Sequence, residues 1–282
     1  MTRTHFDDLA NIALSIRQNI LKMTTAAGSG HPTSSLSAVE IIVGLLFGQN
    51  STGNNYFQCN WQNFEDNSND RLIFSKGHAS PLFYSLFYEL GLVSQEELYQ
   101  FRKLESNLEG HPTPRFPFTL ATTGSLGQGL GIGLGITIAN EIDNIPARTW
   151  VLLGDSELAE GSNWEAMQLA SHRNHSKLIG IIDLNRLGQT SETMTGWDTE
   201  ILSKRVESMG WEIIQVQDGH NLEQVDKAIE LAIDLSNNGT KPIMIIANTI
   251  KGKGVSFLEN KDNWHGKVLN QQELELALEE LV

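Results

Sequence analysis

The sequence predicts an α/β fold in which a parallel sheet is covered by helices on both faces. Short runs rich in β-branched residues alternate with segments of helical periodicity, and the runs are apolar at nearly every position, which is typical of strands buried on both faces. The chain has 282 residues, of which 40% are hydrophobic and 19% charged, enough for a sizeable core. No internal repeat or low-complexity linker divides it, so we expect one domain over residues 1–282.

The first elements follow from periodicity and chain breakers. Leu9, Ile12 and Ile16 fall at helical spacing and predict an amphipathic helix that ends at the Gly- and Pro-rich segment 28–32. A mostly apolar helix is expected over 36–47, followed by an asparagine-rich surface loop. A short strand over 71–75 and a helix over 82–90 come next.

The second half repeats strand and helix. Strands are expected over 149–153, 177–184, 211–216 and 242–247. Helices are expected over 160–173 and 222–235. A capping-box-like segment, Asn270 to Glu273, predicts the start of a final helix.

The charge balance excludes several classes of partner. Lys and Arg total 20 against 34 Asp and Glu, a formal charge of −14, which argues against nucleic-acid binding and against docking on anionic membranes. The N-terminus has no apolar signal core, and the longest apolar stretch, 41–47, is far shorter than the roughly 20 residues that span a bilayer. The single cysteine, Cys59, permits no internal disulfide, so we expect a cytoplasmic protein.

Polar residues follow two successive predicted strands. Asp155 closes one and Asn185 closes the next, so both are expected at the carboxyl edge of the sheet, where open α/β sheets bind ligands. With the backbone carbonyl of Leu187 they form an oxygen donor set suited to Mg²⁺ or Ca²⁺. In the alternative interpretation, Asp155 caps the following helix and Asn185 makes an Asx turn.

A glycine-rich loop precedes another helix. The segment 124–129 fits neither the dinucleotide fingerprint nor a P-loop, but its backbone N–H groups would still suit a diphosphate. Alternatively, Gly127, Gly131 and Gly135 form a small-residue face for close helix packing.

Histidine and lysine supply further candidates. Four of the eight histidines follow a glycine, and a fifth precedes one: His31, His78, His111, His220 and His265. Such histidines would contact a diphosphate or move protons near pH 7; the alternative for each is a hydrogen-bonded loop residue. Lys251 follows a strand and would reach an anion, or else belongs to a solvated turn. Glu157, Glu160 and Glu165 are expected on a solvated helix face, with Glu160 alternatively at a subunit contact.

Taken together, these segments resemble the N-terminal, diphosphate-binding domain of transketolase, a thiamine diphosphate enzyme. The similar segments occur in family order and cover nearly the whole chain: AAGSGHPTSS, SKGHASP, EGHPTP, TGSLGQGLG, LGDSELAEGSNWEA, DLNRLGQT, KGKG and WHGK. The resemblance implies the thiamine diphosphate-binding fold.

The resemblance also implies a role for each matching position. Asp155, Asn185 and the Leu187 carbonyl would hold Mg²⁺, with Ca²⁺ as a substitute. His31, His111 and His265 match histidines that face substrate hydroxyls, and Glu160 matches a glutamate that couples cofactor sites across the subunit interface. The positions expected to bind thiamine diphosphate are Ser34, His78, Gly124, Ser125, Leu126, Gly154, Ser156, Asn185, Gln189 and Lys251. Ser156 departs from the family pattern, which has glycine there.

The length is the larger departure. Transketolases usually continue into a pyrimidine-binding domain and a C-terminal domain, and the family's chemistry needs a glutamate from the pyrimidine domain. We therefore expect one subunit of a split transketolase, active only with a second chain, and assembled as an α2β2 heterotetramer. The implied reaction moves a two-carbon ketol group from a ketose phosphate to an aldose phosphate.

Three other functions remain to be weighed. One is a related thiamine diphosphate enzyme of the dihydroxyacetone or deoxyxylulose-phosphate synthase type, or a transketolase for an unusual sugar. Another is a non-catalytic homologue, against which the metal pair and the histidines argue. A nucleotide-dependent oxidoreductase is disfavoured because the dinucleotide fingerprint is missing.

Overall fold

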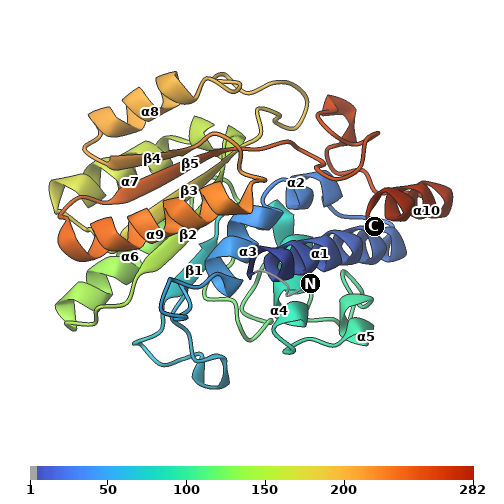
Figure 1. The fold of residues 1–282 in the computed structure, drawn as a ribbon, viewed down its shortest axis with the longest axis horizontal. Helices are drawn as coiled ribbons and strands as arrows, with labels where there is room; N and C mark the ends of the chain where they lie inside the picture. The colour runs from blue at the N-terminus through green and yellow to red at the C-terminus, as the bar shows by residue number, and fades with distance from the viewer. Residues whose placement is uncertain (1–4) are drawn as a thin grey trace.

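The centre of the molecule is a parallel sheet, which confirms the predicted α/β class. The computed structural model describes residues 5–282; residues 1–4, part of the segment in which no signal core was expected, lie outside them. Over the described residues the sheet has five strands in the order β1-β2-β3-β5-β4, all parallel (Figure 1). The strands are β1 Arg71–Phe74, β2 Thr149–Gly154, β3 Leu178–Leu184, β4 Glu212–Val216 and β5 Ile243–Asn248.

Alternate residues of a strand pack into two separate hydrophobic cores, one on each face of the sheet. In β2, Trp150 and Leu152 belong to one buried cluster, whereas Val151 and Leu153 belong to the other. Successive side chains of a strand point to opposite faces, so a sheet covered on both sides needs apolar residues at every position. The unbroken apolar runs in the sequence have this cause.

Helices cover both faces. The first core is completed by α1, α2, α3, α4, α5, α9 and α10, and the second by α6, α7 and α8. Their bounds are α1 His5–Ala27, α2 Pro32–Leu36, α3 Val39–Phe47, α4 Ser80–Glu89, α5 Gln95–Leu98, α6 Gly129–Ile142, α7 Gly161–His172, α8 Thr199–Ser208, α9 Leu222–Asn238 and α10 Gln271–Glu280. Short 3-10 turns are η1 Trp61–Asn63, η2 Gly77–Ala79, η3 Ser156–Ala159 and η4 Asp262–Trp264.

The expected helix over 36–47 is interrupted. α2 ends at Leu36 and α3 begins at Val39; between them Ser37 donates a hydrogen bond to Asp183 (2.6 Å), and Ala38 departs from helical geometry (φ −102°, ψ 11°). This break places the short helix α2 at the carboxyl edge of β3. A purely hydrophobic pattern does not reveal it, since both helices are buried.

The glycines of α6 pack differently from the expected face. A Cβ atom on Gly129 would lie 2.2 Å from Ser75, and one on Gly133 would lie 2.5 Å from Val151. At Gly131 and Gly135 a Cβ would meet nothing within 4 Å. Gly129 and Gly133 therefore allow the close packing of α6 against the sheet. The predicted small-residue face that included Gly131 and Gly135 is wrong, because these two glycines make no close contact within the described part of this chain.

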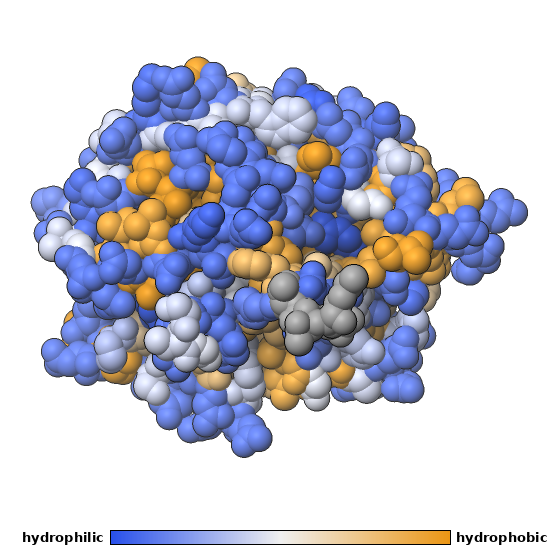
Figure 2. Space-filling view, viewed as in Figure 1, coloured by the Kyte–Doolittle hydropathy of each residue, from blue (hydrophilic) through white to orange (hydrophobic). Residues whose placement is uncertain are grey.

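The surface agrees with the acidic composition. The face shown in Figure 2 is mostly hydrophilic, and hydrophobic side chains gather on it in several separate areas. Among residues 5–282, no helix combines the length and the apolar character that crossing a bilayer requires.

Candidate functional site

A cavity of about 140 Å³ lies at the carboxyl ends of β2 and β3. Sheet register sets Gly154 beside Asp183, so the turns after these two strands start at the same level of the sheet. The cavity is lined from seven separate stretches of the chain, and most of the predicted site residues are among them. Its lining is His31, Ser34, Lys76, His78, Leu126, Gly154, Asp155, Ser156, Glu157, Asn185, Leu187, Gln189, Lys251 and His265.

Asp155 has one carboxylate oxygen without a partner. Its Oδ1 accepts a hydrogen bond from the backbone N–H of Ser156 (2.8 Å), whereas Oδ2 is buried and accepts none from the described residues. Burial and the nearby charge of Asp183 raise the pKa of Asp155 to about 7. A buried carboxylate with a free oxygen is costly unless a cation or a donor meets it.

Asn185 makes the Asx turn of the alternative interpretation, and its role as a metal ligand stays a prediction. Its Oδ1 accepts a hydrogen bond from the Leu187 N–H (3.2 Å), which is the Asx-turn geometry. The same turn brings the Leu187 carbonyl into the cavity, where it accepts a hydrogen bond from the Lys251 ammonium (3.0 Å). Among the described residues no group of three or more His, Cys, Asp or Glu side chains gathers to hold a metal.

The donor chemistry nevertheless fits Mg²⁺ or Ca²⁺. The predicted set contains one carboxylate, one amide oxygen and one backbone carbonyl, all hard oxygen donors. The unpartnered Oδ2 of Asp155 is the observation that favours a cation there. Mg²⁺ usually fills its remaining positions with water or ligand phosphates, so a single protein carboxylate is sufficient.

Lys76 and Asp183 form a buried ion pair that the sequence reasoning missed. The Lys76 ammonium donates to Asp183 and to Ser37 Oγ (2.9 Å). Asp183 also accepts hydrogen bonds from Ser37 and Thr249. Burial alone would raise the pKa of Asp183, but the Lys76 charge and these hydrogen bonds hold it below its usual range. Asp183 lies near the end of the strand that Asn185 follows, two positions before Asn185, and this was a signal in the sequence that could have placed Asp183 at the site.

Four histidine rings meet along the cavity and beyond it. The ring centroids of His31 and His78 are 4.8 Å apart, those of His31 and His265 5.1 Å, and those of His78 and His111 4.5 Å. Burial, followed by the charges of neighbouring residues, lowers the pKa of His31 to about 3 and those of His78 and His265 to about 4. Burial and Arg102 also lower the pKa of His111. All four rings are therefore neutral near pH 7 in the ligand-free chain.

Lys251 fixes the orientation of His265. Its ammonium donates to the carbonyls of Leu187 and Gly188 (3.0 and 2.8 Å) and lies 3.1 Å from His265 Nδ1. Because an ammonium only donates, Nδ1 of His265 accepts, and the proton of the neutral ring is on Nε2. Burial and the charge of Lys76 lower the pKa of Lys251 to about 8. Lys251 is buried, so the alternative of a solvated turn is wrong.

His111, Gly124 and Ser125 line an adjoining open cavity that shares His78 with the first. Gly124 has φ +122°, and a Cβ there would lie 2.6 Å from the His111 ring. Glycine therefore lets the loop pass directly over that imidazole. His111 Nε2 and His31 Nδ1 are buried without hydrogen-bond partners among the described residues.

Glu160 lies outside both cavities. It is an exposed residue at the start of α7, and its side chain lies beside Gly127. The structure does not bring it to the other predicted cofactor residues, and its role at a subunit contact stays a prediction.

Glu157 is buried, which corrects the expectation of a solvated helix face. The η3 turn carries it inward, where its carboxylate accepts hydrogen bonds from Ser75 Oγ (2.5 Å), the Gly127 N–H (2.9 Å) and the Gly154 N–H (3.2 Å). Desolvation raises its pKa. The Glu157 side chain thus joins the ends of β1 and β2 to the glycine loop. Its position only two residues after Asp155, in the turn that follows β2, was the signal in the sequence that could have predicted its burial.

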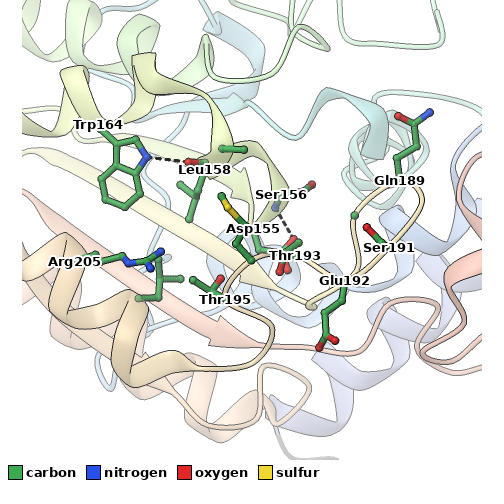
Figure 3. Close-up of a pocket in the computed structure, with 14 residues that line it drawn as sticks. Asp155, Ser156, Leu158, Trp164, Gln189, Ser191, Glu192, Thr193, Thr195 and Arg205 are labelled. Atoms are coloured by element: carbon green, nitrogen blue, oxygen red, sulfur yellow. Dashed lines mark hydrogen bonds between the residues drawn. The ribbon is translucent and has the colours of Figure 1, made fainter.

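A larger cavity of about 440 Å³ lies on the other side of the Asp155–Ser156 turn (Figure 3). It is bounded by Trp164 of α7, by the loop after Gly188 and by Arg205 of α8, and it shares Asp155, Ser156 and Gln189 with the first cavity. No histidine or lysine lines it within the described part of the chain. The chemistry-bearing residues therefore favour the smaller cavity as the site.

Residues 10–281 match the family model of the thiamine diphosphate binding domain of transketolase. The chain is 41% identical over 274 residues to human transketolase, a match that covers 97% of this chain and 42% of that protein. It is also 36% identical over 278 residues to a protein of Actinobacillus succinogenes that is named as one subunit of apulose-4-phosphate transketolase. That match covers 98% of this chain and 96% of the relative.

Solved structures give the same result. The chain superposes on transketolase from Campylobacter jejuni with a TM-score of 0.84 at 30% identity, covering 100% of this chain and 43% of that one. The transketolase from Leishmania mexicana matches with a TM-score of 0.84 at 27% identity, covering 97% of this chain and 41% of that one. The chain thus spans about two fifths of the length of the full transketolases that it matches.

Proposed function

Because the chain belongs to the transketolase family, we propose that it is one subunit of a split transketolase. In this proposal residues 1–282 form a single thiamine diphosphate-binding domain, and a second chain carries the pyrimidine-binding and C-terminal domains. The match along 96% of a relative that is itself named as one transketolase subunit supports this division. Two such pairs would close into an α2β2 heterotetramer around a two-fold axis.

The reaction we propose is transfer of a two-carbon ketol group from a ketose phosphate to an aldose phosphate. When bound, thiamine diphosphate supplies the electron sink for breaking the C2–C3 bond of the donor sugar. His31 and His265 face one cavity from two loops and would move the proton of the donor's C3 hydroxyl. His111, reached through the adjoining cavity, would hold the C1 hydroxyl. In the ligand-free chain both imidazoles are neutral, and His265 has its proton on Nε2, from which it would donate to the sugar.

The cofactor assignments rest on the unpartnered oxygen of Asp155 among the cavity residues. Asp155, Asn185 and the Leu187 carbonyl would hold Mg²⁺, with Ca²⁺ as a substitute. Gln189 would lie beside the cofactor rings. The diphosphate would be held by Ser34, His78, Gly124, Ser125, Leu126, Gly154, Ser156, Asn185 and Lys251. Glu160 would act at the subunit interface.

A specialised sugar is the second candidate. The relative of matching length is named for apulose 4-phosphate, so a donor other than the common pentose phosphates has a specific observation in its favour. Either way the substrates are sugar phosphates, and neither nucleic acid nor membrane is among the proposed partners. We propose a cytoplasmic location.

The test is reconstitution with the partner. The candidate partner is a chain resembling the pyrimidine and C-terminal domains, encoded beside this one. The two purified chains should comigrate at the mass of two copies of each, and together they should transfer ketol groups when offered a panel of ketose phosphates. Neither chain alone should do so. Full activity of this chain by itself would contradict the split.

Cofactor binding is tested separately. Titrating the purified pair with thiamine diphosphate plus Mg²⁺ should release heat, and Asp155→Ala should weaken binding about 100-fold or more, since it removes the carboxylate of the metal set. His172→Ala, an exposed histidine at the end of α7, is the matched control. Undiminished binding by Asp155→Ala would overturn the cofactor assignment.

A further inference from the structure

Lys251 sits on a turn that is held by backbone contacts rather than by its own side chain alone. We call residues 249–254 the Lys251 turn. The Gly252 N–H donates to the Thr33 carbonyl (3.0 Å), and the Lys251 carbonyl accepts from the Asn260 N–H (2.8 Å). These contacts tie the turn to α2 and to the segment that leads to His265. The N–H of Ile250, immediately before Lys251, donates to a side chain instead: His220 Nε2 (2.8 Å).

His220 reaches this turn from the loop after β4. Gly219 lets the chain lie directly against the end of β5, where a Cβ would be 2.7 Å from Thr249 and 2.9 Å from the Asn248 carbonyl. The Gly219 N–H also donates to that carbonyl (2.7 Å). Gly219 thus allows two backbone segments to lie in direct contact, and this brings the His220 imidazole within hydrogen-bond distance of the Ile250 N–H. His220 lines neither the 140 Å³ cavity nor the adjoining one.

The two hydrogen bonds of His220 define its tautomer. Nε2 accepts from a backbone N–H, so it carries no proton. Nδ1 lies 2.9 Å from Glu40 Oε2 and therefore carries the proton and donates. A doubly protonated ring would set an N–H against the Ile250 N–H, so the contact to the turn requires the neutral ring.

Glu40 is in turn fixed by Arg17. Arg17 contacts Glu40 through two nitrogens (2.6 and 2.9 Å), and its Nε donates to the Lys253 carbonyl at the far end of the Lys251 turn (3.2 Å). Burial alone would raise the pKa of Glu40, but Arg17 and the His220 hydrogen bond lower it to about 2. We call Arg17, Glu40 and His220 the Arg17 cluster. The cluster makes hydrogen bonds to the turn on both sides of Lys251, at Ile250 and at Lys253.

We propose that His220 is a positioning residue that holds the Lys251 turn, so that Lys251 is aimed at the Leu187 carbonyl and at His265. Its role in ketol transfer rests on the proposed function. Its structural action on the turn does not, because every contact in the chain from Glu40 to Lys251 lies within this subunit. The imidazole acts through the backbone of Ile250 and touches no reacting group.

Two near-isosteric variants separate the two hydrogen bonds. In His220→Gln, the side-chain oxygen lies near the position of Nε2 and still accepts from Ile250, while the contact to Glu40 is lost. In His220→Asn, the side-chain amide lies near the position of Nδ1 and still donates to Glu40, while the acceptor for Ile250 is lost. A role in global stability alone predicts that both variants behave alike.

The rate of tryptic cleavage measures how well the turn is held in place, because Lys251 and Lys253 are both cleavage sites within it. Lys251 is 2% exposed in the folded chain. Digesting the purified full chain, we expect cleavage after these two lysines to be about tenfold faster in His220→Asn, the change that losing one buried hydrogen bond produces. His220→Gln should stay within about twofold of wild type. Cleavage after the exposed Lys204 of α8 reports general unfolding and should not change in either variant.

Assays of the reconstituted pair give a second readout. His220→Asn should lower kcat and raise the half-saturating thiamine diphosphate concentration, each by up to about tenfold, because the proposed function places Lys251 at the diphosphate as well as beside His265, while His220→Gln keeps most of the turnover and of the cofactor affinity. The inference is overturned if both variants are digested like wild type, if cleavage rises equally in both, or if only His220→Gln is cleaved faster. If the wild-type pair transfers no ketol group, the proposed function fails, yet the digestion still decides the role of His220.

Discussion

Two buried polar regions lie on either side of the Lys251 turn, and they differ in how completely their hydrogen bonds are satisfied. In the histidine cavities, His31 Nδ1, His111 Nε2 and Asp155 Oδ2 have no partner among the described residues. In the Arg17 cluster, the guanidinium, the Glu40 carboxylate and both nitrogens of His220 are paired. The first region can therefore accept further hydrogen-bond partners, whereas the second is saturated.

This difference has an energetic meaning. Buried polar atoms without partners destabilise a chain, and a ligand that pairs with them recovers part of that free energy. In a saturated cluster the ion pair and hydrogen bonds offset much of the cost of desolvating the charges, and removing one member leaves a buried group without its partner. Changes in the cavities should therefore alter chemistry and binding, whereas changes in the Arg17 cluster should alter stability and the geometry of the turn.

The largest expected effect is on turnover. His265→Ala should lower ketol transfer by the reconstituted pair about 10²–10⁴-fold, the usual contribution of a placed acid–base group. Thiamine diphosphate affinity, measured by calorimetry, should change far less, because His265 would face the substrate. The exposed His172→Ala should have full activity. An unchanged rate for His265→Ala would remove this histidine from the catalytic set.

Next in size is the loss of a buried charge. Glu40→Gln leaves the Arg17 guanidinium buried without its carboxylate and should lower the free energy of unfolding by about 3–5 kcal/mol in urea titrations. Glu200→Gln breaks an exposed pair with Lys204 and should cost under about 0.5 kcal/mol. Equal losses for the two variants would mean that the Arg17 cluster contributes no more than a surface pair.

A smaller effect concerns how the free energy of unfolding depends on pH, because the histidine cavities and the Arg17 cluster should contribute over different pH ranges. The unfolded histidines bind protons below about pH 6.5, whereas burial keeps the folded His31 neutral down to about 3, so the free energy of unfolding should fall as the pH drops below about 6.5. Glu40 is protonated near 4.5 when unfolded and only near 2 when folded, so its stabilising contribution should be lost between those values.

Urea titrations of the ligand-free chain at several pH values check this order. Compared at the same pH values, His31→Asn should flatten the upper part of the profile, and Glu40→Gln should flatten the lower part. A wild-type free energy that stays constant from pH 7 to pH 5 would contradict the assignment of neutral, buried histidines.

The smallest expected effect concerns Ser156, which departs from the family's usual glycine. Within the described residues, Ser156 is not among those with positive φ, so the turn does not require glycine. Ser156→Gly should keep cofactor affinity within about threefold and lower the free energy of unfolding by about 0.5–1 kcal/mol through backbone entropy. A tenfold gain in affinity would show that the serine side chain obstructs the diphosphate.

Much of the fold was predictable because its causes are local. The unbroken apolar runs of β2, β3 and β5 reflect a sheet covered on both faces, and the glycine loop before α6 was visible as a loop leading into a helix. The break between α2 and α3 was not predictable from hydrophobicity, since both helices are buried, and Asp183, which Ser37 contacts at the break, is distant in sequence. The polar helix α8 also escaped, because few apolar residues mark its buried side.

The candidate site divides in the same way. Asp155 and Asn185 were placed correctly at one sheet edge, because parallel strands put their carboxyl ends together. The burial of Glu157 was mispredicted, since the chain turns inward at η3 before α7 begins. The pairing of Lys76 with Asp183 and of His220 with Ile250 joins residues far apart along the chain, which no local pattern records.

Periodicity and ordered motifs lie along the chain, so they are sufficient to predict the fold class, the family and the chemical types gathered at the sheet edge. Which of those groups have hydrogen-bond partners and which have none follows from the three-dimensional arrangement. Satisfaction depends on the partner that each donor or acceptor meets across the fold, and that is set by how loops from β1, β2, β3, β4 and β5 converge rather than by any one segment.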